Sequence, residues 1–204
     1  MALGPTREPV ARAAVGQSLL TTLRNQYGQH RQAIESALTA PARDSFASLN
    51  ALRWIPMAHH MELSDLIRER VGEGAANERF WEAAFEELLR RPLLRNFVQM
   101  ILRVPDNPHV AMFRYGPRIF DHIFRDCGTS TTKVFTRPDA PTFIGTWTYE
   151  DFPAAEFTFE CFVEGFQGAI RGSNGVFPGS ERITASLTSA SPAGMFELAV
   201  GLER

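Results

Sequence analysis

The chain contains five histidines and two cysteines, residue types that often bind metal ions or act as bases and nucleophiles. His59 and His60 are neighbours, so on a helix their side chains point about 100° apart and cannot clamp one metal ion together. A zinc-binding helix needs histidines four residues apart, and that spacing is absent. His122, Asp126 and Cys127 match the spacing of no established metal site. We therefore expect no bound metal and histidines that are solvated or hydrogen-bonded.

Motifs for catalysis are also missing. There is no Gly-x-Ser-x-Gly nucleophile elbow. The run Gly172–Gly175 follows a predicted helix rather than a strand and lacks the Lys-Ser/Thr end of a phosphate-binding loop, so it indicates a helix stop. Paired carboxylates such as Glu86 and Glu87 are exposed by pattern, whereas acid–base catalysis needs a buried one. We expect a protein that is not an enzyme, and keep an enzyme with a cryptic site as a third hypothesis.

Composition places the chain among ordinary globular proteins, with 204 residues, 44% hydrophobic residues and a net charge of −2. No apolar run approaches the ~20 residues that a membrane span needs. The near-zero net charge argues against a general nucleic-acid binder. Residues 1–14 lack the apolar core of a secretory signal, and Cys127 and Cys161 form no disulfide framework. These features predict a cytoplasmic protein with free thiols.

Helical periodicity dominates the first 125 or so residues, and the pattern then changes. The predicted helices span residues 11–27, a short segment ending before Pro41, 45–54, 57–71, 78–90, 92–104 and a last one beginning near Pro117. Strands 129–136 and 142–149 form a predicted hairpin, followed by a helix over 154–171 and strands 181–189 and 195–202. The order is helices and then ββαββ, so the fold class is α+β.

We expect a single domain over residues 11–204 after a flexible N-terminus of residues 1–10. Its helical half covers residues 11–125 and its sheet half residues 126–204.

Aromatic side chains gather on the predicted hairpin and on the helix that follows it. Those that can face each other are Phe143, Trp147, Phe159, Phe162 and Phe166. Each aromatic ring can bury about 150–250 Å², so simple core packing accounts for the cluster. The functional interpretation is a lined pocket between sheet and helix, in which Gly165 and Gly168 leave room for a ligand.

Several short motifs follow one another in the same order as in a known family. They are Val15-Gly16-Gln17-Ser18, Gly28, Trp54-Ile55-Pro56, Tyr115-Gly116-Pro117-Arg118 and Glu164-Gly165-Phe166. Together they resemble a large myxobacterial paralogous family, a domain of unknown function, over residues 10–202. The family's aromatic-rich end is here the plainer segment 195–202. This resemblance implies an architecture and no mechanism.

More distantly, the layout is similar to haem nitric-oxide-binding domains and to 4-vinyl-reductase-like domains. Those domains bind haem, tetrapyrroles or other apolar small molecules between a helical half and a sheet. Haem sensors of this fold use a proximal histidine followed by a Tyr-x-Ser-x-Arg motif. Here Tyr115-Gly116-Pro117-Arg118 is one residue too short, lacks the serine and precedes His122. We expect no cofactor, with His122 or His109 the best haem ligand if haem binds.

The sequence therefore favours a non-enzymatic ligand-binding or sensory domain. It would hold an apolar small molecule between its two halves, with His122 beside the aromatic side chains. The alternative is a structural or protein-interaction module with a solid core, which acts through self-association as a homodimer or with a protein partner. Strand 195–202, at the end of the chain, is the expected edge for such contacts.

Overall fold

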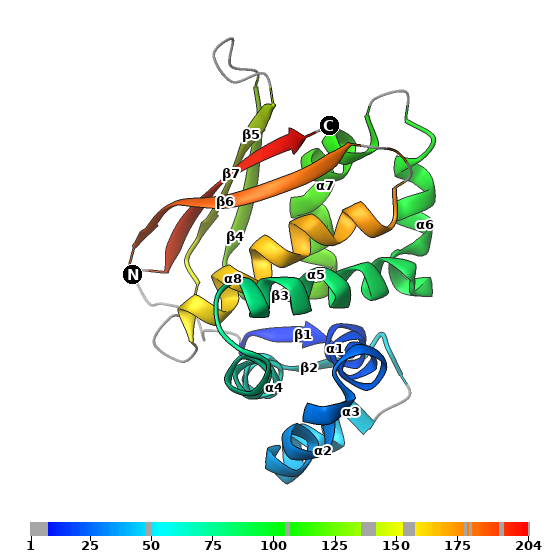
Figure 1. Ribbon diagram of the computed structural model, residues 1–204, viewed down its shortest axis with the longest axis vertical. Helices are drawn as coiled ribbons and strands as arrows, with labels where there is room; N and C mark the ends of the chain where they lie inside the picture. Colours follow the sequence, from blue (N-terminus) through cyan, green and yellow to red (C-terminus); the bar gives the residue numbers. More distant parts are fainter. Residues whose placement is uncertain are drawn as a thin grey trace, which may run out of the picture.

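The computed structural model describes residues 8–47, 50–104, 107–135, 142–152, 158–177, 179, 181–191 and 194–203. Figure 1 shows an antiparallel sheet with helices on one of its faces and further helices beyond them. The predicted fold class, α+β with an N-terminal helical half, is confirmed.

Eight α-helices and one short 3-10 helix are found in the described residues. They are α1 (Ala13–Gln26), α2 (Gly28–Ala37), α3 (Ala40–Ala47), α4 (Met57–Val71), α5 (Ala75–Arg90), α6 (Pro92–Ile101), α7 (Pro108–Ile123), α8 (Phe159–Arg171) and η1 (Gly172–Gly175). The bounds predicted for α4 and the start predicted for α6 are confirmed. Pro92 opens α6 because a first helical position needs no N–H partner.

The larger sheet has four antiparallel strands in the order β4-β5-β7-β6. The strands are β4 (Thr129–Val134), β5 (Phe143–Glu150), β6 (Arg182–Ser191) and β7 (Met195–Glu203). The predicted β4–β5 hairpin pairing is confirmed. The prediction that the last strand is an edge is wrong, because β7 lies between β5 and β6 and its side chains at 196, 198 and 200 are buried. The edges are β4 and β6.

A second, small sheet inside the helical half was missed by sequence analysis. It consists of β1 (Val10–Arg12), β2 (Trp54–Pro56) and β3 (Phe124–Arg125) in the order β2-β1-β3. The predicted helix over 45–54 is therefore wrong at its end, and the helix predicted from residue 11 begins at Ala13, after β1. Strands of two or three residues are too short to show alternation, so only pairing between distant segments defines them.

Helix α7 begins nine residues earlier than predicted. The Asn107 side-chain oxygen accepts hydrogen bonds from the backbone N–H groups of His109 and Val110, and Pro108 occupies the first position. Pro117 lies inside the helix instead of starting it, at the cost of one backbone hydrogen bond. Gly116 precedes it, and the Trp147 ring occupies the space that a side chain there would need.

Helix α8 lies between the larger sheet and α5, as Figure 1 shows. The face toward α5 carries glycines. A Cβ added to Gly165 would lie 3.0 Å from the Trp81 ring, and one added to Gly172 would lie 2.8 Å from the Glu82 carbonyl oxygen. The opposite face carries Phe162 and Phe166, which meet aromatic rings of the sheet. One helix thus joins the two halves.

Gly168→Ala should destabilise the fold through this close contact. The added Cβ would collide with the Glu78 carbonyl oxygen and lie 2.6 Å from Trp81 Cβ, so α8 must move away from α5. We expect a loss of about 1–3 kcal/mol in the free energy of unfolding, measured by urea denaturation. Gly28→Ala is the control, because a Cβ there meets nothing within 4 Å. Equal stability of the two variants would contradict the close packing.

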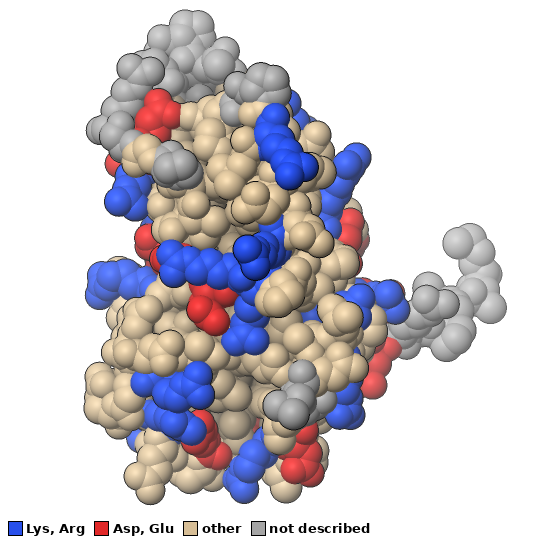
Figure 2. All heavy atoms as spheres, turned by 90° about the vertical axis from the view of Figure 1, so that its right-hand side faces the viewer, with Lys and Arg blue, Asp and Glu red and all other residues tan. Residues whose placement is uncertain are grey.

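No helix in the described part of the chain is long and apolar enough to cross a membrane. The face seen in Figure 2 carries both basic and acidic side chains, and several of the basic ones lie next to each other across its middle. That the chain binds no nucleic acid stays a prediction.

Candidate functional site

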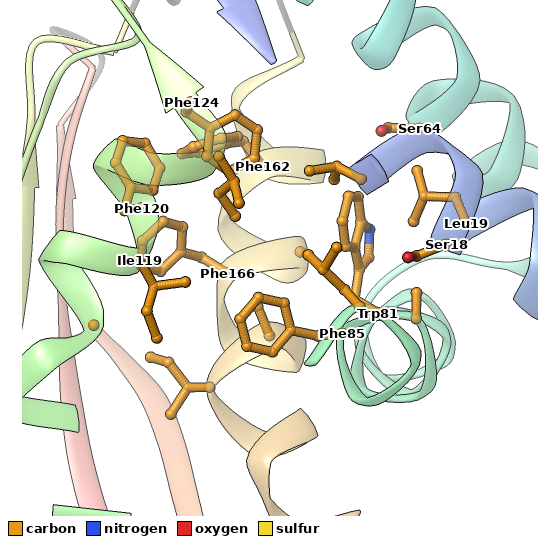
Figure 3. A pocket seen from close by; sticks show the side chains of 18 of the residues that line it. Ser18, Leu19, Ser64, Trp81, Phe85, Ile119, Phe120, Phe124, Phe162 and Phe166 are labelled. Carbon is orange, nitrogen blue, oxygen red and sulfur yellow. The ribbon is translucent and has the colours of Figure 1, made fainter. Parts of the chain in front are cut away.

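An apolar cavity of about 80 Å³ lies between the two halves of the protein. Its walls come from α1, α4, α5, α7 and α8, with Phe124 of β3, Trp147 of β5 and Ile183 of β6. Figure 3 shows Phe120, Phe162 and Phe166 grouped on one side of it and Ser18 and Ser64 on the other. The cavity therefore has an aromatic side and a side that carries polar atoms.

The aromatic side is built from rings that pack edge to face or at a tilt. The ring centroids of Trp147 and Phe166 are 5.0 Å apart, and those of Phe120 and Phe166 are 5.6 Å apart. The indole nitrogen of Trp147 already has a partner, because Nε1 donates a hydrogen bond to Ser130 Oγ at 2.5 Å. Tyr149, next on the same face, donates its hydroxyl to the Cys127 carbonyl oxygen. This side offers a ligand only apolar contacts.

The polar side has four residues from three helices: Ser18 of α1, His60 and Ser64 of α4, and Trp81 of α5. The Ser18 hydroxyl donates to the Ala14 carbonyl oxygen at 3.0 Å, and the Ser64 hydroxyl donates to the His60 carbonyl oxygen at 2.8 Å. Both hydroxyl oxygens can still accept a hydrogen bond. We call these four residues the polar corner.

Two nitrogen atoms of the polar corner are buried without a hydrogen-bond partner, His60 Nδ1 and Trp81 Nε1. Their rings meet edge to face, with centroids 5.8 Å apart. Leaving a buried polar group unpaired costs about 1–3 kcal/mol, so native structures rarely retain such groups without a reason. Burial also lowers the pKa of His60 to about 4, so its imidazole is neutral at pH 7.

Three of the six predicted site residues line the cavity: Trp147, Phe162 and Phe166. Phe159 is only partly buried and packs against Phe152 and Phe196, outside the lining. The Phe143 side chain lies outside the described part of the structure.

The placement of His122 is a correction. It lies on the exposed side of α7, which turns Ile119 and Ile123 inward. His109 is buried elsewhere, with its Nδ1 3.4 Å from Ser173 Oγ. Neither histidine reaches the cavity.

The prediction that Gly165 and Gly168 create the pocket is wrong. Gly168 leaves no room for a ligand, because the backbone of α5 fills the space beside it. Gly165 does line the cavity, but the Trp81 ring occupies the space above it. Most of the aromatic cluster is core, as the first interpretation had it, and the cavity lies on the helical side of that core.

Sequence analysis missed His60, Ser64, Ser18 and Trp81 as site residues. The signal was present in the spacing: Met57, His60, Met61 and Ser64 follow the i, i+3, i+4, i+7 pattern of one helix face. His60 was expected to be solvated or hydrogen-bonded, and this is wrong. Its neighbour His59 is hydrogen-bonded through Nδ1 to Ser45 Oγ at 2.8 Å.

The cysteines are free and buried. Cys161 lines the cavity, and burial raises its pKa above the usual range, which suppresses the thiolate that a nucleophile needs. Burial likewise raises the pKa of Cys127 to about 12. In the described residues no three His, Cys, Asp or Glu side chains are grouped as metal ligands.

Comparison with solved structures finds haem nitric-oxide-binding (H-NOX) proteins. An H-NOX protein from S. oneidensis superposes with a TM-score of 0.64 at 9% identity, covering 95% of this chain and 96% of that chain. One from K. algicida gives 0.63 at 9% identity, covering 95% and 97%. A third structure, from a study of haem distortion in the H-NOX family, gives 0.60 at 16% identity over 94% of each chain. The predicted likeness is confirmed for the fold.

Neither a family model nor a curated protein matches this sequence. The myxobacterial family therefore stays a prediction. Identities of 9–16% establish the fold, and the chemistry must be argued from this chain's own residues.

The residues around the cavity do not fit haem. A neutral buried histidine is a suitable iron ligand, and His60 supplies one. However, no lysine or arginine is among the described residues that line the cavity, so the two haem propionates would be buried without a positive partner. A volume of about 80 Å³ is also far below the ~300–1,000 Å³ of pockets for drug-sized ligands.

Protonation of His60 should make stability depend on pH. The unfolded imidazole has a pKa of 6.5 and the folded one about 4, so the unfolded chain binds more protons between these values. The free energy of unfolding should therefore fall by about 3 kcal/mol as the pH drops from 6.5 to 4. His60→Leu should lose this part of the pH dependence, measured by urea denaturation across that range.

The exposed His122→Leu is the matched control and should keep the full dependence. Burial lowers the pKa of His109 too, so the difference between the wild type and His60→Leu isolates the contribution of His60. Identical pH profiles for the wild type and His60→Leu would show that His60 is solvated.

Proposed function

We propose that this protein is a non-enzymatic sensory domain that binds a small, uncharged, largely apolar molecule in the cavity between its two halves. The observation that carries the proposal is the cavity itself, which is apolar apart from a corner with two unpaired nitrogen atoms. A core without a ligand would be expected to close the space or pair those atoms.

The location of the cavity supports a sensory role. A ligand there touches α1, α4 and α5 on one side and α7, α8, β5 and β6 on the other. Binding would therefore change the packing between halves that α8 holds together. The H-NOX proteins of the same fold are described with unliganded Fe(II) and with Fe(II)NO, which is a precedent for ligand response in this architecture.

Access to the cavity is favoured at Phe85 of α5 and Ala169 of α8. These are the two lining residues that keep partial exposure, whereas the others are buried. Figure 3 shows the Phe85 ring extending from α5 toward the space in front of α8. Rotation of this one side chain would open the site without unfolding a helix.

Filling the cavity should abolish binding. Cyclopentane is a suitable probe because it is apolar, uncharged and smaller than benzene, which occupies a cavity of roughly 150 Å³. It should raise the melting temperature of the wild type and shift the methyl resonances of Leu19 and Ile119. Ala84→Leu places three more carbon atoms in the lining and should remove both effects.

Ala83→Leu is the matched control, because Ala83 is adjacent on α5, partly exposed and outside the lining. It should bind cyclopentane like the wild type. Binding that is unchanged in Ala84→Leu, with that variant folded, would contradict the proposed site.

The interaction module remains a second candidate, now at a different edge. Two large apolar side chains at the end of edge strand β4, Val134 and Phe135, are 40% and 38% exposed and available for contact with a partner. A discrete dimer in sedimentation experiments, combined with no cyclopentane binding, would favour that candidate.

A further inference from the structure

The polar corner restricts the chemistry of any molecule that fills the cavity. Trp81 Nε1 carries a hydrogen and can only donate. His60 is 1% exposed, and in its neutral form it has one nitrogen that donates and one that accepts. Ser18 and Ser64 have used their hydrogens on backbone carbonyl oxygens and retain acceptor capacity.

The donors and acceptors come from separate helices that meet at this corner. Figure 3 shows the Trp81 nitrogen on the side of its ring where Ser18 and Leu19 are drawn, away from Phe166. His60 packs its ring against Trp81 and Phe124, with centroids 5.8 and 5.9 Å apart. The rest of the lining is apolar, so hydrogen-bond partners are concentrated at this one place.

A hydroxyl group on the ligand matches this arrangement of donors and acceptors in both tautomers of His60. It accepts from Trp81 Nε1–H and donates to an unprotonated His60 nitrogen or to a serine oxygen. A charged group does not match, because no lysine, arginine, aspartate or glutamate is among the described lining residues. A wholly apolar molecule would leave both nitrogens unpaired.

We propose that the ligand is a small neutral alcohol, whose hydroxyl group binds at His60 and Trp81 and whose apolar body lies against Phe120 and Phe166. This proposal rests on the binding function proposed above and specifies the class of ligand. The volume limits the ligand to fewer heavy atoms than the six of benzene, because benzene occupies an engineered cavity of roughly 150 Å³, nearly twice this size.

Two probes of equal size distinguish the contribution of the hydroxyl group to binding from that of the apolar body. Cyclobutanol and methylcyclobutane differ only in the replacement of a hydroxyl group by a methyl group. Titrations of the protein followed by NMR should give cyclobutanol the lower dissociation constant by at least about fivefold, the contribution of one net hydrogen bond. Cyclobutanol alone should move the Trp81 indole N–H resonance downfield.

The other two tryptophans are internal controls for that resonance. Trp147 Nε1 already donates to Ser130, and the Trp54 ring stacks with Arg12 and Arg125 outside the cavity. Their indole signals should stay in place. In His60→Phe the preference for cyclobutanol should shrink while methylcyclobutane still binds, because only a hydrogen-bonding group has been removed.

The outcomes distinguish this proposal from the function on which it rests. Equal affinity for the two probes, or a Trp81 N–H signal that ignores cyclobutanol, would overturn the alcohol proposal and leave an apolar binding site. Binding of neither probe would overturn both. A preference that persists in His60→Phe with an unmoved Trp81 signal would place the hydroxyl elsewhere and also overturn the assignment.

Discussion

Helix α8 and the short helix η1 that follows it can lie directly on α5, because Gly165 and Gly168 of α8 and Gly172 of η1 present no side chains to it. The rest of the architecture depends on this contact. The same helix turns Phe162 and Phe166 toward the sheet. Its Glu164 is held by the Arg68 guanidinium at 2.9 and 3.2 Å and by Asn77 Nδ2 at 2.8 Å, which ties α8 to α4 and α5. A bulkier helix would separate the halves and lose the cavity.

The cavity arises because the two faces of α8 differ in bulk: glycines face α5, and aromatic rings face the sheet. Where the glycines allow backbone contact, α5 and α8 approach closely, and Trp81 fills the space above Gly165. The bulky rings of the opposite face hold α7 and β5 further away, and a space of about 80 Å³ remains between them and the polar corner. No lysine or arginine is among its described lining residues, and neither this nor its size fits a haem.

The sequence allowed the fold class and most long elements to be predicted, because periodicity is strong where a whole helix face is buried. The stripe Trp81, Phe85, Leu88 marks α5, and alternation around Trp147 marks β5. Short strands such as Trp54–Pro56 carry no such signal and exist only through their partners. The start of α7 was predicted wrongly at Pro117, because proline often occupies the first position of a helix. In the structure the helix begins at Pro108, with Asn107 as its N-cap.

The site was predictable in part. Phe162 and Phe166 could be placed because large apolar rings must be buried, and any pocket near them had to include them. The spacing also places His60 and Ser64 on one inward helix face. The unpaired nitrogens of the polar corner could not be predicted, because a buried histidine or tryptophan is usually hydrogen-bonded and only packing decides whether a partner is present. His122 was predicted as a ligand-binding residue and as a candidate haem ligand, but the rotation of α7 places it in solvent.

The most direct test of the central claim is to locate a bound probe by intermolecular nuclear Overhauser effects between cyclopentane and labelled methyl groups. We predict contacts with Leu19 of α1, Ile119 of α7 and Ile183 of β6 in the same complex, since all three line the cavity. Contacts confined to exposed apolar side chains such as Leu52 and Leu187, or to one half only, would contradict a binding site between the halves.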